Sequence, residues 1–432
     1  MAPLVTPQIL KGFRDSLPGK EIAKKNWEAR LQKVFESFGF VPIDTPALEY
    51  TQVLLGKGGG ETDKQIYRFQ DNGGRDVALR FDLTVPFARY MALYHNQLAM
   101  PFRRYHMAKV WRGENTQKGR YREFTQCDFD IVGVDSTEAD LEILLVMAAS
   151  LSALVGDQYS IHISHRGLFN RFLENEGLID HSAEILRTVD KLNKIGREEV
   201  LNSLIQQIQE PRALRLMEYI ESRGSFEEIL SILTRLAGGE NPDSERMASL
   251  WNLLGALGLQ KHFVLDPTIT RGLDYYTGVV YESFLTALPQ IGSVCSGGRY
   301  NNLAGLYTKE DLPGVGAAVG LDRLMAGLEE LGLIQETQGL TKALLLNLGV
   351  ETLSEVQKCA QELRSREIAV EVFPEAKKLA VQYKYAEAKS IPYVITLDLT
   401  AVKGKNFNIK NLNTQKQHTS LSLDELCLVL NL

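Results

Sequence analysis

The sequence has few cysteines, and they are not arranged as in any common kind of cysteine site. The four cysteines stand at positions 127, 295, 359 and 427, without a CxxC pair and without a cluster of histidines. This scarcity argues against a disulfide framework and a structural zinc site, and it is typical of a reducing compartment. We therefore expect a cytoplasmic protein with no metal site built from protein ligands alone.

The chain also lacks a hydrophobic run that could cross a membrane. Its most apolar stretch, LEILLVMAASLSALV at 141–155, contains Glu142. This run is shorter than the roughly 20 residues that a crossing needs. The first residues show no basic segment followed by an apolar one, so we expect no export signal and no membrane partner. We predict that residues 141–155 form a buried helix.

Neither of the common glycine-rich nucleotide motifs is present. The stretch GVGAAVG at 314–320 resembles a dinucleotide loop, but such a loop follows a strand, and here KEDLPG precedes it. The stretch GKGGGETDK at 56–64 lacks the lysine and hydroxyl spacing of a P-loop. Any nucleotide would therefore have to be held by side chains on a sheet.

The hydrophobic periodicity and the length of the sequence predict a mixed α/β protein with more than one domain. A chain of 432 residues is too long for one ordinary core. Strand-like runs joined by short polar links precede residue 166 and resume after residue 258, which indicates an antiparallel sheet flanked by helices. Residues 166–258 have helical periodicity, and strands alternate with helices from residue 341 onward.

The stretch VWRGENTQKGRYREF at 110–124 gathers charge around a glycine. Alternation on both sides of Gly119 predicts two strands joined by a turn, with Arg112 and Glu114 on one face. Arg120, Arg122 and Phe124 would share a face in the second strand. A guanidinium presents a planar fork of donors that matches phosphate oxygens, although surface ion pairs would explain any single arginine equally well.

The net charge is −6, yet one segment near the C-terminus is basic. Residues 377–416 contain eight lysines against Glu387 and Asp398. Such a face could bind a phosphate backbone. On composition alone, a solvated lysine-rich surface explains it as well.

Several motifs together resemble the histidyl-tRNA synthetase family of class II aminoacyl-tRNA synthetases. They are the motif 1 proline Pro46, RFDLTVPFARY at 80–90, WRGENTQKGRYREF at 111–124, RGLDYYTG at 271–278, CSGGRYNNL at 295–303 and GLDRL at 320–324. The resemblance covers essentially the whole chain. It implies a catalytic domain of residues 1–165 and 259–330 with a class II antiparallel sheet. It further implies a helical insertion at 166–258 and an anticodon-binding domain at 341–432.

The resemblance implies that the hairpin holds ATP. Arg112 would bind the α-phosphate, Glu114 the adenine amine, and Phe124 would stack on the adenine ring. Arg120 and Arg323 would hold the outer phosphates. The attacking carboxylate is already ionised near neutral pH, so fixed cations are needed more than a strong base.

The resemblance also implies a histidine pocket. Its members would be Asp82, Thr84, Arg112, Gln126, Asp130, Arg271, Tyr275 and Tyr276. Asp82, Thr84 and Gln126 would hold the α-ammonium group, and Asp130 and the tyrosines would face the imidazole. Arg271 would reach the α-phosphate and the histidine carboxylate, so that Arg112 and Arg271 are the expected catalytic residues. Without their motif, the two tyrosines would be read as a core aromatic pair.

The implied activity is that of a histidine–tRNA ligase. Such an enzyme activates L-histidine with ATP, accompanied by Mg²⁺, to histidyl-adenylate and pyrophosphate, and then charges the 3′ end of tRNA(His). We expect a homodimer through the motif 1 segment at 40–49, and Gln117 and Lys118 as tRNA contacts. A non-catalytic paralogue that senses histidine, or a prolyl or threonyl synthetase, would be the alternatives. Paralogues typically lack the anticodon domain and active-site arginines, and RGLDYYTG argues against the other synthetases.

Overall fold

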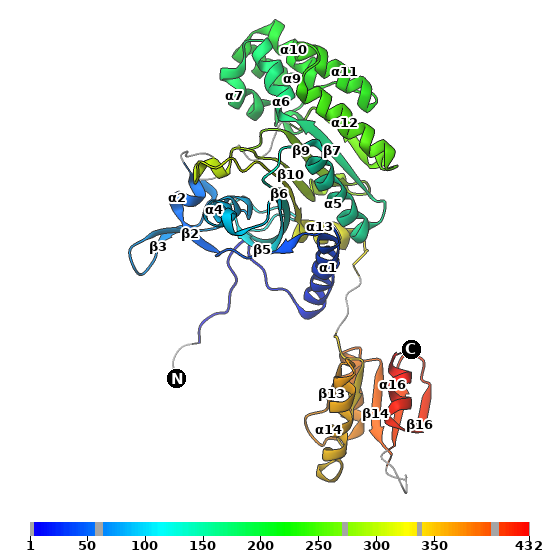
Figure 1. The fold of residues 1–432 in the computed structure, drawn as a ribbon. Helices are drawn as coiled ribbons and strands as arrows, with labels where there is room; N and C mark the ends of the chain where they lie inside the picture. Colours follow the sequence, from blue (N-terminus) through cyan, green and yellow to red (C-terminus); the bar gives the residue numbers. More distant parts are fainter. Residues whose placement is uncertain (1–3, 57–63, 270–274, 335–338, 399–405, 432) are drawn as a thin grey trace. The chain divides into compact units, whose positions relative to one another are not determined.

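The computed structural model describes residues 4–56, 64–269, 275–334, 339–398 and 406–431 (Figure 1). The chain divides into two compact units, one of Met1–Arg14 with Trp27–Leu333 and one of Asp15–Asn26 with Ile334–Leu432. Each unit combines a sheet with helices, so the predicted α/β class is confirmed.

An eight-stranded sheet forms the centre of the first unit, with strand order β1-β5-β6-β11-β10-β9-β7-β8. Its strands are β1 (Val41–Pro42), β5 (Phe102–Trp111), β6 (Glu123–Val132), β7 (Tyr159–His165), β8 (Phe263–Leu265), β9 (Val279–Leu285), β10 (Cys295–Arg299) and β11 (Gly314–Gly320). The GVGAAVG stretch is therefore itself a strand, and not a dinucleotide loop.

The prediction of an antiparallel sheet is right for the interior of this sheet and wrong at both edges. Strands β5, β6, β11, β10, β9 and β7 pair antiparallel in turn. The edge pairs β1–β5 and β7–β8 are parallel. Parallel neighbours need a long crossover connection, and the chain supplies one in each case. A small sheet and α4 separate β1 from β5, and the helical segment separates β7 from β8.

Helices cover one face of the large sheet. They include α1 (Pro18–Ser37), α5 (Thr137–Val155) and α13 (Leu321–Glu330). The ring of Phe35 on α1 lies 5.0 Å from that of Phe129 on β6, and α5 begins where Ser136 accepts the N–H of Ala139. One side of α5 is buried, including Ile143, Leu144 and Met147, as predicted for the helix at 141–155. None of the described helices combines the length and hydropathy of a membrane span.

Smaller elements lie on the opposite face of the sheet from these helices. A three-stranded sheet has the order β2-β4-β3 and adjoins two short helices. These elements are β2 (Leu48–Tyr50), α2 (Thr51–Leu55), β3 (Arg68–Gln70), β4 (Asp76–Leu79) and α4 (Thr84–Tyr94). The segment between β4 and α4 contributes to the pocket described below.

Residues 166–256 are helical, in agreement with their periodicity, and Figure 1 shows these helices gathered together. They are α6 (Arg166–Asn175), α7 (Ser182–Val189), α8 (Leu192–Ile195), α9 (Arg197–Ile208), α10 (Glu210–Ile220), α11 (Phe226–Leu236) and α12 (Pro242–Ala256). The ring of His165 accepts the N–H of Leu168 at the start of α6, so this histidine has a structural role.

The second unit contains a five-stranded sheet of order β13-β12-β14-β15-β16 and three helices of the C-terminal region. Its elements there are β12 (Ala343–Leu345), α14 (Val350–Ser365), β13 (Val370–Val372), α15 (Leu379–Ala388), β14 (Tyr393–Leu397), β15 (Phe407–Asn411), β16 (Gln417–Leu421) and α16 (Leu423–Asn431). Buried side chains of α14 and α16 pack on the strands and form a core of their own.

Candidate active site

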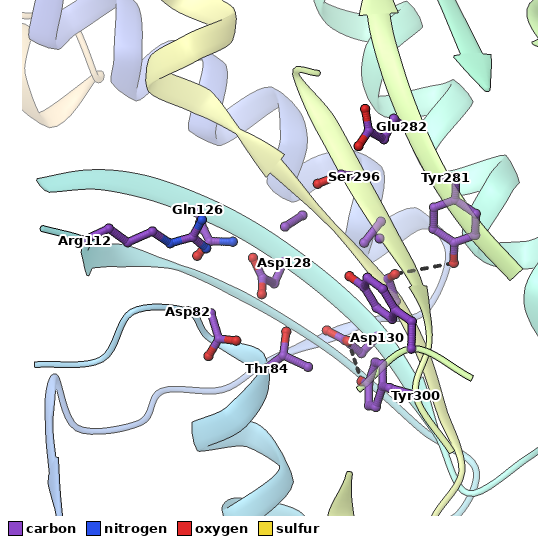
Figure 2. Close-up of a pocket in the computed structure, with 15 residues that line it drawn as sticks. Asp82, Thr84, Arg112, Gln126, Asp128, Asp130, Tyr281, Glu282, Ser296 and Tyr300 are labelled. Atoms are coloured by element: carbon purple, nitrogen blue, oxygen red, sulfur yellow. Dashed lines mark hydrogen bonds between the residues drawn. The ribbon is translucent and has the colours of Figure 1, made fainter. Parts of the chain in front are cut away.

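A polar cavity of about 240 Å³ lies on the face of the large sheet that the helices leave open. Gln126, Asp128 and Asp130 point into it from β6 (Figure 2), because alternate residues of a strand face the same side. The residues that line the cavity are Asp82, Thr84, Arg112, Gln126, Asp128, Asp130, Tyr276, Tyr281, Glu282, Ser296, Gly297, Tyr300, Gly316, Ala317 and Ala318. The structure thus brings together most of the residues predicted for the histidine pocket.

Asp82 enters the cavity from the turn before α4. Its Oδ1 accepts the N–H of Val85 at 3.1 Å, and its Oδ2 accepts the hydroxyl of Tyr275 at 3.3 Å. Burial raises the pKa of Asp82 to about 6, and the backbone N–H of Val85 and the charge of Arg112 oppose this rise. The carboxylate is therefore ionised at neutral pH and can bind a cation inside the cavity.

Asp130 is held from two sides. The hydroxyl of Tyr300 donates to its Oδ1, and Nη2 of Arg104 lies 2.8 Å from its Oδ2. On the neighbouring strand, a Cβ atom at Gly316 would lie only 2.0 Å from Asp130 Oδ1, so only glycine leaves room for this carboxylate. Burial raises the pKa of Asp130, and the charge of Arg104 counteracts that rise.

Arg104, Asp128 and Tyr300 belong to this site but were not predicted from the sequence. Asp128 could have been predicted from the sequence. It lies two residues from Gln126 and two from Asp130, which is the spacing of residues on one face of a strand. Arg104 faces the site only because β5 pairs with β6 in the register that sets Arg104 opposite Asp130. Tyr300 follows β10, and sequence spacing alone does not place it beside Asp130.

The arginines predicted to bind phosphates lie at one end of this site. Nη1 of Arg112 is 3.8 Å from Glu114 Oε1, and Nη1 of Arg120 is 3.5 Å from Glu114 Oε2. The Arg112 guanidinium also lies 5.3 Å from the centre of the Phe124 ring and donates through Nε to the carbonyl of Phe81. These contacts hold Arg112 in place before any ligand binds.

Arg323, on α13, joins the same group. It donates to the carbonyl of Ser293 at 2.7 Å, and its Cγ would lie 3.1 Å from a Cβ atom on Gly119. Gly119 has φ +71°, a left-handed conformation that favours glycine, and it brings the loop close to Arg323. Burial lowers the pKa of Arg323 to about 10, and the positive charges of Arg120 and Arg112 add to the effect.

The predicted hairpin exists, but its strands are shorter than expected. They end at Trp111 and restart at Glu123. Beyond these residues the N–H of Arg112 donates to the carbonyl of Arg122, and an isolated bridge joins Gln117 to Arg120 at the tip of the loop. Arg122 does not join the arginine group, since its guanidinium donates to the carbonyls of Glu114 and Lys11.

The remaining predicted residues fall into three groups. Arg271 lies outside the described residues. The rings of Tyr275 and Tyr276 contact each other edge to face, with their centres 5.1 Å apart. Gln117 pairs with Arg120 across the tip of the loop, and Lys118 is exposed and forms an ion pair with Glu330 at 2.7 Å. Among the described residues, no group of three or more His, Cys, Asp or Glu side chains is suited to hold a metal ion.

Comparisons with known proteins match this geometry. Residues 12–324 match the sequence model of the family described as histidyl-tRNA synthetase, and residues 342–431 match the anticodon binding domain. A histidine–tRNA ligase of Treponema denticola is 52% identical over 404 residues, which cover 92% of this chain and 90% of the relative. The corresponding ligase of Treponema pallidum is 47% identical and covers 95% of each chain.

Solved structures agree with the sequence comparison. The crystal structure of histidyl-tRNA synthetase from Nostoc sp. PCC 7120 superposes with a TM-score of 0.87 at 29% identity, and the match covers 99% of both chains. A structure from Bacillus halodurans C, described as an ATP phosphoribosyltransferase regulatory subunit/histidyl-tRNA synthetase, gives a TM-score of 0.74 at 25% identity. That match covers 89% of this chain and 97% of the other. These matches include both the domain with the large sheet and its cavity and the C-terminal domain. The chain therefore belongs to the histidyl-tRNA synthetase family.

Proposed function

We propose that this chain acts as a histidine–tRNA ligase at the cavity above β6. It activates L-histidine with ATP to histidyl-adenylate and pyrophosphate, and then transfers histidine to the 3′ end of tRNA(His). The observation that supports this most is the cluster formed by Arg112 and Arg120 on either side of Glu114, with Arg323 against Gly119 of the same loop, beside a pocket lined by carboxylates. The arginines can bind the phosphates of a triphosphate, and the carboxylates can bind the positive charge of an amino acid.

The charges of histidine and ATP indicate which residues of the site bind each part of the two substrates. The ammonium group of histidine binds Asp82 with Thr84 and Gln126, which places its carboxylate toward Arg112. ATP enters with Mg²⁺ as its counterion, and its adenine stacks on Phe124 with the amine toward Glu114. The carboxylate attacks the α-phosphate, where negative charge builds up, and Arg112 and Arg271 stabilise that charge. Arg120 and Arg323 hold the outer phosphates until pyrophosphate leaves.

The second unit binds the anticodon stem-loop in this proposal. Phosphates meet lysines of the basic segment, while unstacked bases supply sequence readout. Within that segment, Lys377 pairs with Glu375 at 2.9 Å and Lys389 with Glu371 at 2.6 Å. Lys378 and Lys384 are exposed and are better placed to contact phosphates than these paired lysines.

We further propose a cytoplasmic class II homodimer. The motif 1 segment ends at β2 and includes β1, which lies at the edge of the large sheet with Val41 46% exposed. An edge strand with an exposed apolar side chain is a natural contact for a second subunit. A histidine-sensing paralogue has structural support from the Bacillus halodurans neighbour, but the anticodon domain and the three arginines favour the ligase.

The proposed substrate is tested by ATP–pyrophosphate exchange with each of the standard amino acids. A pocket that hydrogen-bonds a polar side chain rejects isosteres without those groups by about 10⁴–10⁵-fold. We therefore expect exchange with histidine alone. Exchange that depends on proline or threonine, or no exchange with any amino acid, would contradict the proposal.

The pH dependence of histidine use reports on Asp82. Binding of the α-ammonium group needs the ionised carboxylate, and the pKa of Asp82 is raised to about 6 by burial. The kcat/KM for histidine should therefore fall as the pH is lowered through 6, by up to about tenfold per pH unit. The substrate imidazole also titrates near pH 6.5, and burial raises the pKa of Asp128 and of Asp130 in the same cavity, so Asp82→Asn, which removes only the Asp82 titration, is the control. Identical profiles for both proteins would remove Asp82 from ammonium binding.

A further inference from the structure

A buried ion network joins the helical segment 166–256 to the large sheet. Arg246 on α12 donates through Nε to Asp140 Oδ2 at 2.5 Å and through Nη1 to Asp135 Oδ1 at 2.7 Å. Arg299, the last residue of β10, donates through Nε to Asp140 Oδ1 at 2.8 Å. The two oxygens of the Asp140 carboxylate on α5 therefore bind one arginine from the helical segment and one from the sheet.

This network lies deep inside the protein. Asp140 is 0% and Arg299 is 1% exposed, and Nη2 of Arg246 is buried without a hydrogen-bond partner among the described residues. Burial raises the pKa of Asp140, and the charges of Arg299 and Arg246 counteract that rise. Buried ion pairs are weak evidence for stability, but they can fix one arrangement of the elements that they join. Here these elements are α12, α5 and the end of β10.

Arg299 also holds the end of the RGLDYYTG motif. Its carbonyl accepts the N–H of Thr277 at 2.7 Å, and the Thr277 hydroxyl accepts the N–H of Asn301 at 3.1 Å. A Cβ atom at Gly278 would lie 3.0 Å from Cδ of Arg299, so the arginine side chain packs directly on this glycine. The residue that binds Asp140 therefore fixes the position of residues 277–278 on β10.

The residues next to these contacts belong to the cavity. Tyr276 comes just before the held segment and Tyr300 just after Arg299, and both tyrosines line the cavity. Figure 2 shows the hydrogen bond between Tyr300 and Asp130. A Cβ atom at Gly298 would lie 2.9 Å from the ring of Tyr276, so this ring lies close against β10. A shift of Arg299 would therefore displace both tyrosines.

We propose that Arg246 is a positioning residue for histidine activation and acts through Asp140 and Arg299 on Tyr276 and Tyr300. The inference rests on the proposed function, in which histidine binds in this cavity. Arg246 belongs to α12 and is not among the residues that line the cavity, so its effect on histidine is indirect. Such coupling acts in both directions, so bound histidine also stabilises the position of α12.

The first test is Arg246→Met, which keeps the length of the side chain and removes its charge. In pyrophosphate exchange we expect the KM for histidine to rise at least about tenfold and the KM for ATP to stay within about twofold, because Tyr276 and Tyr300 lose their fixed position. Arg246→Lys should bring the KM for histidine back to within about threefold of the wild type, because it restores a positive charge beside Asp140.

Arg171→Met is the matched control. Arg171 on α6 donates through Nε to Asp243 on α12 at 2.6 Å, so this variant breaks an ion pair to the same helix within the helical segment. We expect its KM for histidine to stay within about twofold of the wild type. The Tm and the fraction of active sites are measured for every variant, because a loss of folded protein lowers the maximal rate and leaves KM unchanged.

A double-mutant cycle tests the route of the effect. Tyr300→Phe removes the hydroxyl that binds Asp130. The factor by which Arg246→Met raises the KM for histidine should be at least about threefold smaller in the Tyr300→Phe background than in the wild type. Equal factors in the two backgrounds would overturn the inference.

Hydrogen exchange of the wild type tests the coupling without a substitution on the network. Saturating histidine should slow amide exchange in α12 at least about threefold and leave α10, in the same helical segment, unchanged. Exchange in α12 that does not slow, or that slows no more than in α10, would contradict the coupling.

The outcomes separate this inference from the proposed function. If the wild type activates histidine while Arg246→Met keeps its KM for histidine and loses only Tm, Arg246 is a structural residue. The inference is then wrong, and the proposed function stands. A wild-type protein that does not activate histidine would overturn the proposed function itself.

Discussion

Replacing Arg112 with alanine is expected to lower histidine-dependent pyrophosphate exchange by about 10³-fold, the usual loss when a fixed donor to a developing charge is removed. The reason is its position: Arg112 is held by the carbonyl of Phe81 and by Glu114 before ligand binds. It therefore does not have to reorganise as charge builds on the α-phosphate. Exchange measured at saturating ATP and histidine checks this result.

Arg103→Ala is the control for this experiment. Arg103 lies on β5, the strand that ends just before Arg112, but it forms an ion pair with Glu142 on α5, away from the cavity. A partly exposed ion pair contributes little, so we expect exchange within about twofold of the wild type. Equal losses in Arg103→Ala and Arg112→Ala would mean that the effect comes from the strand and not from the site.

Removal of residues 341–432 should separate the two steps of the reaction. Histidine activation needs only the cavity on the large sheet, so exchange should persist within a few-fold. Charging of tRNA(His) should fall by about 10²-fold or more, because the contacts that bind the anticodon stem-loop are lost. The unit to which residues 342–431 belong has a hydrophobic core of its own, which supports removing it as a piece.

A variant of the full-length chain controls for damage caused by the truncation. Lys378→Glu with Lys384→Glu reverses two exposed charges and leaves the core untouched. We expect normal exchange, with a loss of charging relative to the wild type that is largest at low salt and shrinks as the salt concentration rises, because salt weakens the phosphate contacts that only the wild type makes. If charging survives in both variants, the basic segment does not bind tRNA.

Part of this fold and site could be predicted from local pattern. Alternation on both sides of Gly119 predicted a hairpin with a turn at this glycine, and the structure has that turn, with Gly119 at φ +71°. The helix at α5 was likewise predicted from its apolar run. Such features depend on neighbours within a few residues along the chain.

The rest depends on pairing between distant segments. Arg104 joins Asp130 only through the register of β5 and β6, and Tyr300 reaches Asp130 from a residue 170 positions away. The parallel pairs β1–β5 and β7–β8 depend on long connections between the paired strands, and hydrophobic periodicity does not show which strands such a connection brings together. The departure of Arg122 toward Lys11 has the same origin, because the partner lies 111 positions earlier in the chain. The functional roles of the site residues stay predictions until they are measured.

Rapid-quench measurement of a single turnover tests most directly whether the arginine group acts on the transition state. Wild type and Arg112→Ala would be saturated with histidine, and the rate of adenylate formation would be followed as ATP is varied. We predict that the maximal rate falls about 10³-fold while the ATP concentration for half-maximal rate changes only a few-fold. An unchanged maximal rate with greatly weakened ATP binding would contradict the account, because Arg112 would then serve only to hold the ground state.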